Sequence, residues 1–381
     1  MPFIPLALYI HIPWCIRKCP YCDFNSHNAP NNLPEKQYIQ ALLNDLAQEL
    51  PSIWGRRLES IFIGGGTPSL FSAESMDELI SGIRALLPFR PNLEITLEAN
   101  PGTFEQEKFK GFREAGINRL SVGIQSFNPQ HLQALGRVHN QAEALKAAEV
   151  ARYAGFDNFN LDLMFGLPQQ NLEQAVADLQ QAIDLQPTHL SWYQLTLEPN
   201  TLFYKHPPVL PDDDLLVDMQ YAGQALLQQA GYAQYEVSAY AQPERECRHN
   251  LNYWQFGDYL GIGAGAHGKI TDHFGQVTRH QKYRQPAQYL QQTELGQARS
   301  ETQTLTAADL KFEFMLNALR LKSGFDLELF TKRTGLSSET LQEPLALAEQ
   351  KGWLVIDQNH IQTTELGWQF LNTVIQLFLN D

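Results

Sequence analysis

The chain has 381 residues and a formal net charge of −14, from 28 Lys and Arg against 42 Asp and Glu. This acidity disfavours a nucleic-acid surface, which needs a basic face, and it gives no general attraction to anionic lipid. No apolar run approaches the ~20 residues of a membrane span. Four cysteines, three of them clustered, do not make a disulfide framework. With no cation before Arg17 to suggest a signal peptide, we expect a cytoplasmic protein.

Short β-rich runs alternate with helical patterns from residue 6 to residue 195. We predict strands at 6–12, 58–63, 93–98, 119–124, 159–164 and 190–195, and helices near 35–50, 72–87, 105–115, 141–154 and 171–185. Gly116 and Gly155 follow two of these helices, where C-terminal glycine caps belong. Repeated strand–helix units predict an α/β fold with a parallel sheet, and six units fit a partial, open barrel better than a closed eightfold one.

The pattern changes after a proline-rich junction near residue 205. A helix near 212–230 and a strand near 234–240 follow, and the end of the chain is mainly helical. There we predict helices at 306–322, 326–334 and 338–351, extended pieces at 353–356 and 360–362, and a last helix from Glu365. This order outlines a winged helix, and it divides the chain into residues 1–205, 206–300 and 301–381.

The winged-helix outline raises the question of DNA binding. The candidate recognition helix carries Glu339, Glu343 and Glu349, and no cation precedes Lys351, so it would meet phosphates with the wrong sign of charge. We therefore favour a structural or partner-docking role. The last helix is strongly apolar, which predicts core packing, with contact to a partner or a membrane as the alternative.

Three cysteines, Cys15, Cys19 and Cys22, stand in the segment HIPWCIRKCPYCDF with the spacing C-x3-C-x2-C. Three thiolates this close can hold three irons of a cubic [4Fe–4S] cluster and leave the fourth iron open to a small molecule. A zinc site is the alternative, but such sites usually come as pairs of close-spaced ligands with a recognisable fourth ligand.

Other polar and glycine residues collect where the predicted strands end, the edge at which parallel α/β folds place their sites. They are the glycines of GGGTP (64–68), Glu98, Gln125 and Asp162, with Arg137 in a following loop. Glycines let backbone approach a ligand, carboxylates accept hydrogen bonds from ammonium or ribose hydroxyl groups, and an arginine pairs with a carboxylate. Singly, each is explained as well by a turn or a helix cap. Together they suit a zwitterionic amino acid that bears a nucleoside.

These motifs resemble those of radical S-adenosylmethionine (SAM) proteins, with Tyr21 just before the last cysteine. YIHIPWC, FIGGGTPSLF, LEANPGT, RLSVGIQSFN, LGRVHN and NLDLMFGLP look like the coproporphyrinogen oxidase-type branch, over nearly the whole chain. The resemblance implies a six-fold (β/α) partial barrel with a C-terminal, mainly helical domain, and a [4Fe–4S] cluster on the three cysteines. It also implies SAM contacts at Tyr9, Tyr21, Gly65, Gly66, Thr67, Glu98, Gln125, Arg137 and Asp162.

That branch contains oxygen-independent coproporphyrinogen III oxidases, which decarboxylate two propionates to vinyl groups, and haem chaperones of the HemW type. The oxidases continue the cysteine motif as C-x-C and carry a long N-terminal extension. Here the residue two beyond Cys22 is Phe24, and fourteen residues precede Cys15. The segment HNLNYW (249–254) matches the HNxxYW motif of the chaperone group.

The residues of HNxxYW suit haem. An imidazole can ligate haem iron, so His249 is the candidate ligand, and Tyr253 and Trp254 can cover a porphyrin face. Cys247 could compete as a thiolate, but a buried structural thiol is the preferred interpretation. The glycine-rich segment 261–268, which contains His267, is expected to form a loop that closes over SAM, with a structural role for His267.

We therefore expect a haem chaperone that delivers haem, its cargo, to acceptors such as respiratory cytochromes, with no nucleic-acid partner. A haem-linked homodimer and a transient peripheral membrane contact are further expectations from the resemblance. The alternatives are a coproporphyrinogen III oxidase of porphyrin biosynthesis and a radical enzyme with another substrate. The sequence leaves open whether SAM is cleaved, and so whether the protein is an enzyme.

Overall fold

A computed structural model describes residues 4–102 and 107–379. Within them, the largest sheet has twelve strands in the order β14–β13–β12–β11–β1–β4–β5–β6–β7–β8–β10–β9. Its central strands are parallel: β11 (Asp258–Ile262), β1 (Leu6–Ile12), β4 (Leu58–Gly65), β5 (Phe89–Ala99), β6 (Arg119–Gln125), β7 (Phe159–Phe165) and β8 (His189–Gln194). The antiparallel edges are β9 (Ala233–Glu236), β10 (Ala239–Ala241), β12 (His267–Thr271), β13 (Val277–Lys282) and β14 (Arg299–Thr304). The short strands β2 (Trp14–Cys15) and β3 (His27–Asn28) pair separately.

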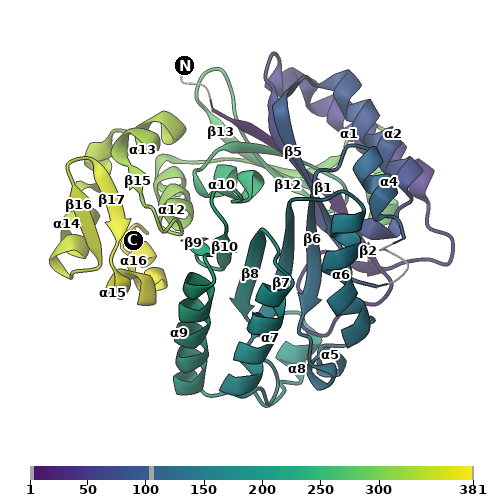
Figure 1. The fold of residues 1–381 in the computed structure, drawn as a ribbon. Helices are drawn as coiled ribbons and strands as arrows, with labels where there is room; N and C mark the ends of the chain where they lie inside the picture. Colours follow the sequence, from purple (N-terminus) through teal and green to yellow (C-terminus); the bar gives the residue numbers. More distant parts are fainter. Residues whose placement is uncertain (1–3, 103–106, 380–381) are drawn as a thin grey trace.

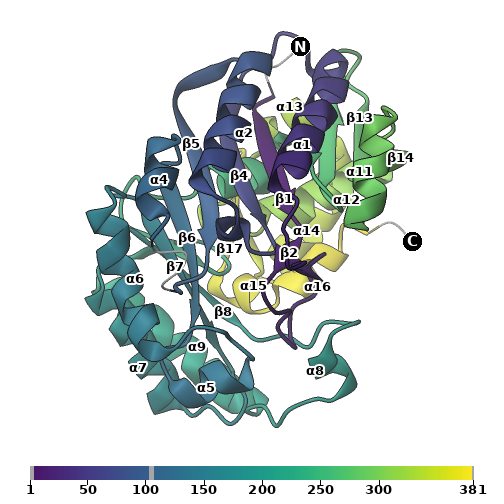
Figure 2. The same cartoon turned by 90° about the vertical axis from the view of Figure 1, so that its right-hand side faces the viewer.

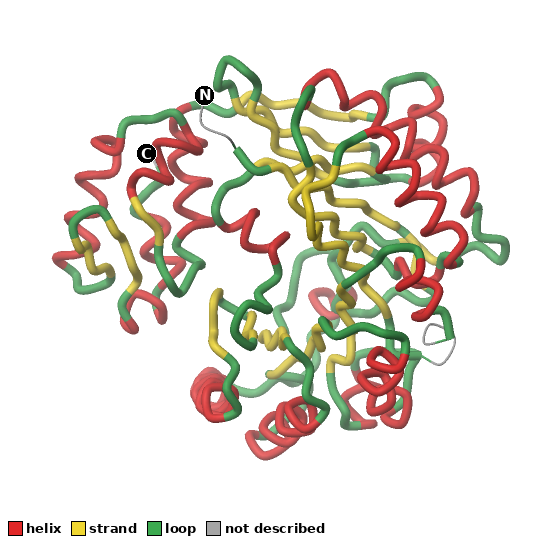
Figure 3. The backbone as a smooth tube through the Cα atoms, turned by 45° about the horizontal axis from the view of Figure 1, so that its top comes forward, coloured by secondary structure: helices red, strands yellow, loops and turns green. Residues whose placement is uncertain are grey.

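Helices pack on the outer face of the curved sheet, as Figures 1, 2 and 3 show. They are α1 (Glu35–Glu49), α2 (Ala73–Leu86), α4 (Phe109–Glu114), α6 (Gln141–Tyr153), α7 (Leu172–Asp184) and α9 (Asp213–Gln229). Shorter connections and an edge helix complete this part: η1 (Leu50–Ile53), η2 (Pro68–Leu70), α5 (Pro129–Ala134), α8 (Leu202–Lys205), α10 (Arg248–Trp254) and α11 (Pro286–Glu294). Strands β1, β4 and β6 are buried along most of their length, as expected of a parallel sheet covered on both faces.

The C-terminal region forms a second hydrophobic cluster around Phe314, Phe325 and Phe330. Its elements are α12 (Ala307–Ala318), β15 (Phe325–Asp326), α13 (Leu327–Thr334), η3 (Ser338–Leu341), α14 (Gln342–Gln350), β16 (Leu354–Asp357), β17 (His360–Thr363), α15 (Glu365–Gln369) and α16 (Leu371–Gln376). The sheet β15–β17–β16 and its helices form the predicted winged-helix-like arrangement, drawn in yellow in Figure 1.

The six predicted barrel strands are confirmed, with ends that differ by at most four residues. The loop expected at 261–268 is confirmed only for residues 263–266, because 261 and 262 end β11, a further parallel strand beside β1, and 267 and 268 begin β12. Gly261 serves close packing of strands, since a Cβ on it would lie 1.9 Å from the carbonyl oxygen of His267. It was therefore misleading as a loop signal, whereas Gly263 and Gly265 lie in the loop with positive φ angles of 102° and 81°.

Other differences concern element ends. The strand expected at 234–240 is the hairpin β9–β10, and the helix expected at 306–322 ends at Ala318. The last helix is broken at Phe370 into α15 and α16, and most of its apolar side chains are buried in the core. Of the helix predicted at 105–115, residues 105 and 106 lie outside the described residues. Gly116 and Gly155 have positive φ angles of 103° and 90°, as their predicted capping role requires.

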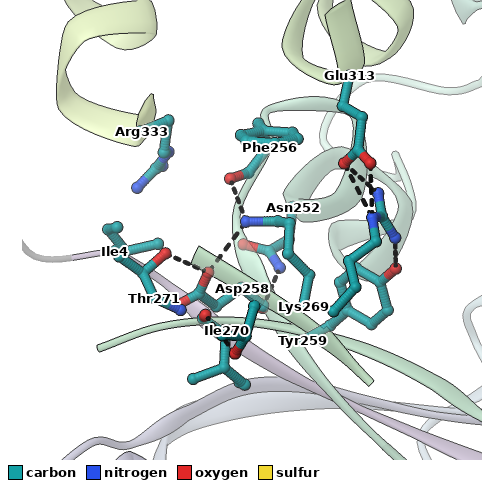
Figure 4. Close-up of polar contacts among 12 residues, drawn as sticks. Ile4, Asn252, Phe256, Asp258, Tyr259, Lys269, Ile270, Thr271, Glu313 and Arg333 are labelled. Atoms are coloured by element: carbon teal, nitrogen blue, oxygen red, sulfur yellow. Dashed lines mark hydrogen bonds and ion pairs between the residues drawn. The ribbon is translucent and has the colours of Figure 1, made fainter. Parts of the chain in front are cut away.

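Asp258, the first residue of β11, is a buried carboxylate that ties several segments together (Figure 4). It accepts hydrogen bonds from Arg56 Nη1 at 2.8 Å, Lys269 Nζ at 3.0 Å and the Thr271 N–H at 2.9 Å. Burial by itself would raise the pKa of Asp258, but the charges of Lys269 and Arg56 lower it below its ordinary value. Strand β11, which was not predicted from the sequence, is thus held at its first residue by a buried carboxylate that is paired with two cations.

Replacing this carboxylate should destabilise the fold. Asp258→Asn leaves Lys269 buried without its counter-ion and should lower the free energy of unfolding by about 3–5 kcal/mol at pH 7. The loss should shrink as the pH falls through the lowered pKa of Asp258, because the wild type then loses the same charge. Denaturant titration checks this, with Asp157→Asn, whose ion pair with Arg245 is exposed, as the control. Equal losses in both variants would contradict the assignment.

Candidate functional site

A cavity of about 530 Å³ opens at the carboxyl ends of the parallel strands. The structure brings most of the sequence-predicted residues to its wall: Cys15, Cys19, Cys22, Tyr21, Gly65, Gly66, Thr67, Glu98, Gln125, Arg137, Asp162 and Trp254. Three of the predicted residues, Tyr9, His249 and Tyr253, are absent from its lining among the described residues.

The cysteine loop runs between β2 and β3, whose parallel pairing fixes its two ends. All three thiols are free and partly exposed, and the Cys22 N–H donates to the Cys19 carbonyl oxygen at 3.2 Å, which tightens the loop. Arg137 Nη1 donates to Cys19 Sγ at 3.7 Å. Burial raises the pKa of Cys15 and Cys22, so a bound cation or metal is needed to hold them as thiolates. This donor set, three thiols on one loop beside a guanidinium, fits an iron–sulfur cluster.

In residues 4–102 and 107–379, no three or more His, Cys, Asp or Glu side chains are placed to hold a single metal ion. The three thiols come from one loop and line one part of the cavity, and other residues line the rest of its wall.

The glycine loop after β4 packs against the protein's own chain. A Cβ on Gly65 would lie 2.4 Å from the His11 ring, and one on Gly66 would lie 2.6 Å from the Trp14 carbonyl oxygen. The Gly65 N–H donates to Glu98 Oε2 at 3.0 Å. The glycines therefore allow the cysteine segment, β4 and β5 to meet at one point, in addition to exposing backbone toward the cavity.

Two carboxyl groups, Glu98 and Asp162, stand together at the base of the cavity. Burial, reinforced by the charge of Asp162, raises the pKa of Glu98 to about 7. Burial also raises the pKa of Asp162, although Asn160 Nδ2 and Ser121 Oγ donate to its two oxygens at 2.8 and 3.0 Å. Two neighbouring buried acids that both line the cavity are suited to an ammonium or hydroxyl group of a ligand.

Gln125 and Arg137 complete this wall. Gln125 ends β6 with a φ of 69°, a left-handed conformation that is uncommon for a residue with a side chain, and its Oε1 accepts from Tyr193 OH at 2.9 Å. Arg137 is held by Asn100 Oδ1 at 2.7 Å and the Gly123 carbonyl oxygen at 2.8 Å. The cation is thus oriented before any ligand binds.

The HNxxYW segment forms α10, whose two faces point to different surroundings. Asn250 and Trp254, four residues apart on the helix, line the cavity. His249 is 9% exposed, its Nδ1 shares a hydrogen bond with Ser60 Oγ at 3.2 Å, and its ring lies 5.1 Å from that of Phe62. The motif therefore brings its tryptophan, and not its histidine, into the cavity.

Three further residues singled out from the sequence lie close to His249: Tyr9, Tyr253 and Cys247. Tyr9 donates or accepts through its OH to His11 Nδ1 at 3.0 Å, and its ring centroid is 6.5 Å from that of His249. Tyr253 packs on Trp254 and Tyr259. Cys247 is fully buried, donates to Glu94 Oε1 at 3.6 Å, and has its pKa raised by burial to about 12, as a structural thiol would.

Sequence reasoning missed several residues of the cavity wall. Ser121 and Tyr193 belong to strands that were predicted. The place of Tyr193 near the carboxyl end of β8 could have suggested it, but Ser121 is only the third residue of β6. Glu236, Ser238 and Arg320 come from the β9–β10 hairpin and the turn after α12. No local motif marks these three, since only the folding of distant segments brings them to the site.

Comparison with known proteins agrees with this geometry. Residues 9–182 match the model of the Radical SAM superfamily, and residues 305–370 match the HemN C-terminal domain. The chain is 52% identical over 381 residues to the heme chaperone HemW of Haemophilus influenzae (99% of this chain, 98% of the relative). It is 51% identical over 375 residues to the heme chaperone HemW of Escherichia coli (98% of each).

The solved structure of coproporphyrinogen III oxidase (HemN) from Escherichia coli matches with a TM-score of 0.84 at 26% identity, over 99% of this chain and 91% of that one. The resemblance inferred from the motifs and the fold that it implied are confirmed.

The raised pKa of Glu98 predicts a pH-dependent affinity for SAM. If Glu98 receives the ammonium group of SAM, the affinity of the protein with a reconstituted cluster should rise with pH through about 7, because only the ionised carboxylate attracts that group. Glu98→Gln should bind more weakly and lose this rise. Equilibrium dialysis with SAM at pH 6, 7 and 8 measures it, with the exposed Glu114→Gln as the control. A rise of the same steepness in Glu98→Gln would contradict the assignment.

Proposed function

Because the chain belongs to the radical SAM superfamily and, within it, to the family of HemW heme chaperones, we propose that it binds haem and passes it to acceptor proteins. The observation that carries the proposal is the position of α10. Its HNxxYW segment contributes Asn250 and Trp254 to the same cavity that the cysteines and the two carboxyl groups line. Respiratory cytochromes are the proposed acceptors.

The cysteine wall is proposed as the cofactor side of the cavity. Cys15, Cys19 and Cys22 would hold a [4Fe–4S] cluster, which with SAM supplies redox chemistry when bound. Glu98, Asp162 and Arg137 would orient the ammonium, ribose and carboxylate groups of SAM, with Tyr21, Gly65, Gly66, Thr67 and Gln125 completing the contacts. Tyr9 would act through His11 and the glycine loop, since it does not line the cavity.

His249 is proposed as the ligand of haem iron. Burial lowers its pKa to about 3, so its imidazole is neutral, the form that coordinates a metal. The hydrogen bond with Ser60 engages Nδ1 and leaves Nε2 as the ligand atom. Since the residue is 9% exposed and its ring packs against Phe62 and Ser60 of β4, ligation requires the ring to leave these contacts. Tyr253 and Trp254, next to each other on the helix, would then cover the porphyrin.

The proposed parts of the chain take different tasks. Residues 1–205 would carry the cluster and SAM, residues 206–300 the haem helix, and residues 301–381 the docking of partners. Among the described residues no helix is long and apolar enough to cross a membrane. A transient membrane contact and a haem-linked dimer remain proposals.

Haem titration tests the role of His249. His249→Ala should lower haem affinity at least about tenfold and change the absorption spectrum of the bound haem, because an axial ligand is lost. The matched control is His273→Ala, which removes an exposed histidine from the turn between β12 and β13. Unchanged spectrum and affinity in His249→Ala would remove His249 as the ligand, and failure of the wild type to bind haem would contradict the proposed function.

The likeness to the oxidase structure favours one rival, an oxygen-independent coproporphyrinogen III oxidase. Phe24, half-exposed at the cavity where the oxidase-type motif has a further cysteine, argues against it. Anaerobic incubation of the reconstituted protein with coproporphyrinogen III, SAM and a reductant decides between the two. We expect no protoporphyrinogen IX, and its formation would establish the rival.

A further inference from the structure

One part of the cavity wall is built from three segments that are far apart in the sequence. The β9–β10 hairpin contributes Glu236 and Ser238, α10 contributes Trp254, and the turn after α12 contributes Arg320. A β-bridge between Glu236 and Leu321, together with a bond of 3.0 Å from the Lys322 N–H to the Tyr235 carbonyl oxygen, holds the turn against the hairpin. Arg320 thus reaches the cavity from the region that matches the HemN C-terminal domain.

Two hydrogen-bond donors on this wall have no partner. Arg320 Nε and Trp254 Nε1 are buried and unpaired within the described part of the chain. The Arg320 guanidinium carbon lies 4.6 Å from the centre of the Trp254 ring, so both donors stand at one place. A buried donor left unpaired costs about 1–3 kcal/mol, and such groups in native structures call for an explanation. A ligand that accepts a hydrogen bond from each of the two donors would supply this explanation.

The chemistry of the two donors points to a carboxylate. A guanidinium offers a planar pair of N–H groups that matches two carboxylate oxygens, and an indole N–H adds a neutral donor. The indole ring also provides an apolar face next to the charge, which suits an acid attached to an aromatic system. A cation in this position is notable in a chain of net charge −14.

We propose that Arg320 and the indole N–H of Trp254 form a carboxylate subsite that receives a propionate of haem. The proposal rests on the proposed function, since haem is taken as the ligand of this cavity. It assigns Arg320 as a specificity-determining residue, and it gives the C-terminal region a direct part in holding the cargo.

The buried carboxyl group of Glu236 should oppose the binding of a propionate to Arg320. Its carboxyl group is 5% exposed, accepts from the Ser238 N–H at 3.1 Å, and lies in the electrostatic reach of Arg320. When ionised it competes with the propionate for the guanidinium and repels it. Removing the charge at Glu236 should therefore strengthen haem binding, whereas removing the charge at Arg320 should weaken it.

The experiment titrates the full chain, with its cluster reconstituted, with haem and with haem dimethyl ester, in which both propionates are esterified. Arg320→Gln should weaken haem binding about ten- to a hundredfold, the range for a lost hydrogen bond to a charged group, and should leave ester binding unchanged. Arg320→Lys should recover part of the loss, and Glu236→Gln should bind haem more tightly than the wild type. The control is the exposed Arg57→Gln, whose position lies outside the cavity lining.

The outcomes of this titration distinguish a failure of the carboxylate subsite from a failure of the proposed function. Equal haem affinity in Arg320→Gln and the wild type overturns the subsite and leaves the proposed function standing. A wild type that binds neither haem nor its ester contradicts the proposed function itself. If Arg320→Gln loses cluster content or helical circular dichroism, Trp254→Phe decides, because it removes one donor and keeps a ring. Trp254→Phe should weaken haem binding more than ester binding, and an equal effect on both overturns the proposal.

Discussion

The parallel register of the central strands is the constraint on which the site depends. It pairs Ile12 with Gly65 across β1 and β4, Glu98 with Ser121 across β5 and β6, and Gly123 with Asp162 across β6 and β7. Residues that are far apart in the chain therefore meet at one edge. Because successive side chains of a strand alternate between the two faces of the sheet, a shift of one residue in either of the last two pairs would turn Glu98 or Asp162 out of the cavity.

A second consequence of the register is the link between the cavity and α10. Glu94, on β5 four residues before Glu98, accepts from the His249 N–H at 3.3 Å and from the Cys247 thiol. Further along the sheet, Asn160 bonds both Asp162 and His189, and His189 Nε2 bonds Tyr235 OH at 2.8 Å. Buried polar contacts thus run from the cavity floor to the helix that carries the proposed haem ligand. Any movement of α10 that exposes His249 must break some of them.

The sequence predicts those parts of the site that belong to a local motif. The cysteine spacing, GGGTP and the two acids were identified because each lies in a β-rich run or directly after one, and the structure brings them to one cavity. Strand β11 was missed because Gly261 opens a glycine-rich segment typical of a loop, and this glycine is needed only once β12 packs against β11. The arrangement of α10 could not be foreseen, since burial of His249 depends on Phe62 and Ser60 of another strand. Arg320 has no neighbouring signal, because its surroundings come from the hairpin and α10.

Electron paramagnetic resonance of the reduced cluster tests most directly whether haem shares one cavity with the cluster. Spectra and relaxation rates of the reconstituted protein would be recorded with and without one equivalent of haem whose iron is paramagnetic. Since the cavity of about 530 Å³ is lined by both the cysteines and Trp254, the two iron centres should interact. We expect the cluster signal to relax faster or to broaden when haem binds, and we expect this effect to be smaller in Trp254→Ala. Bound haem that leaves the cluster signal unchanged would contradict the shared cavity.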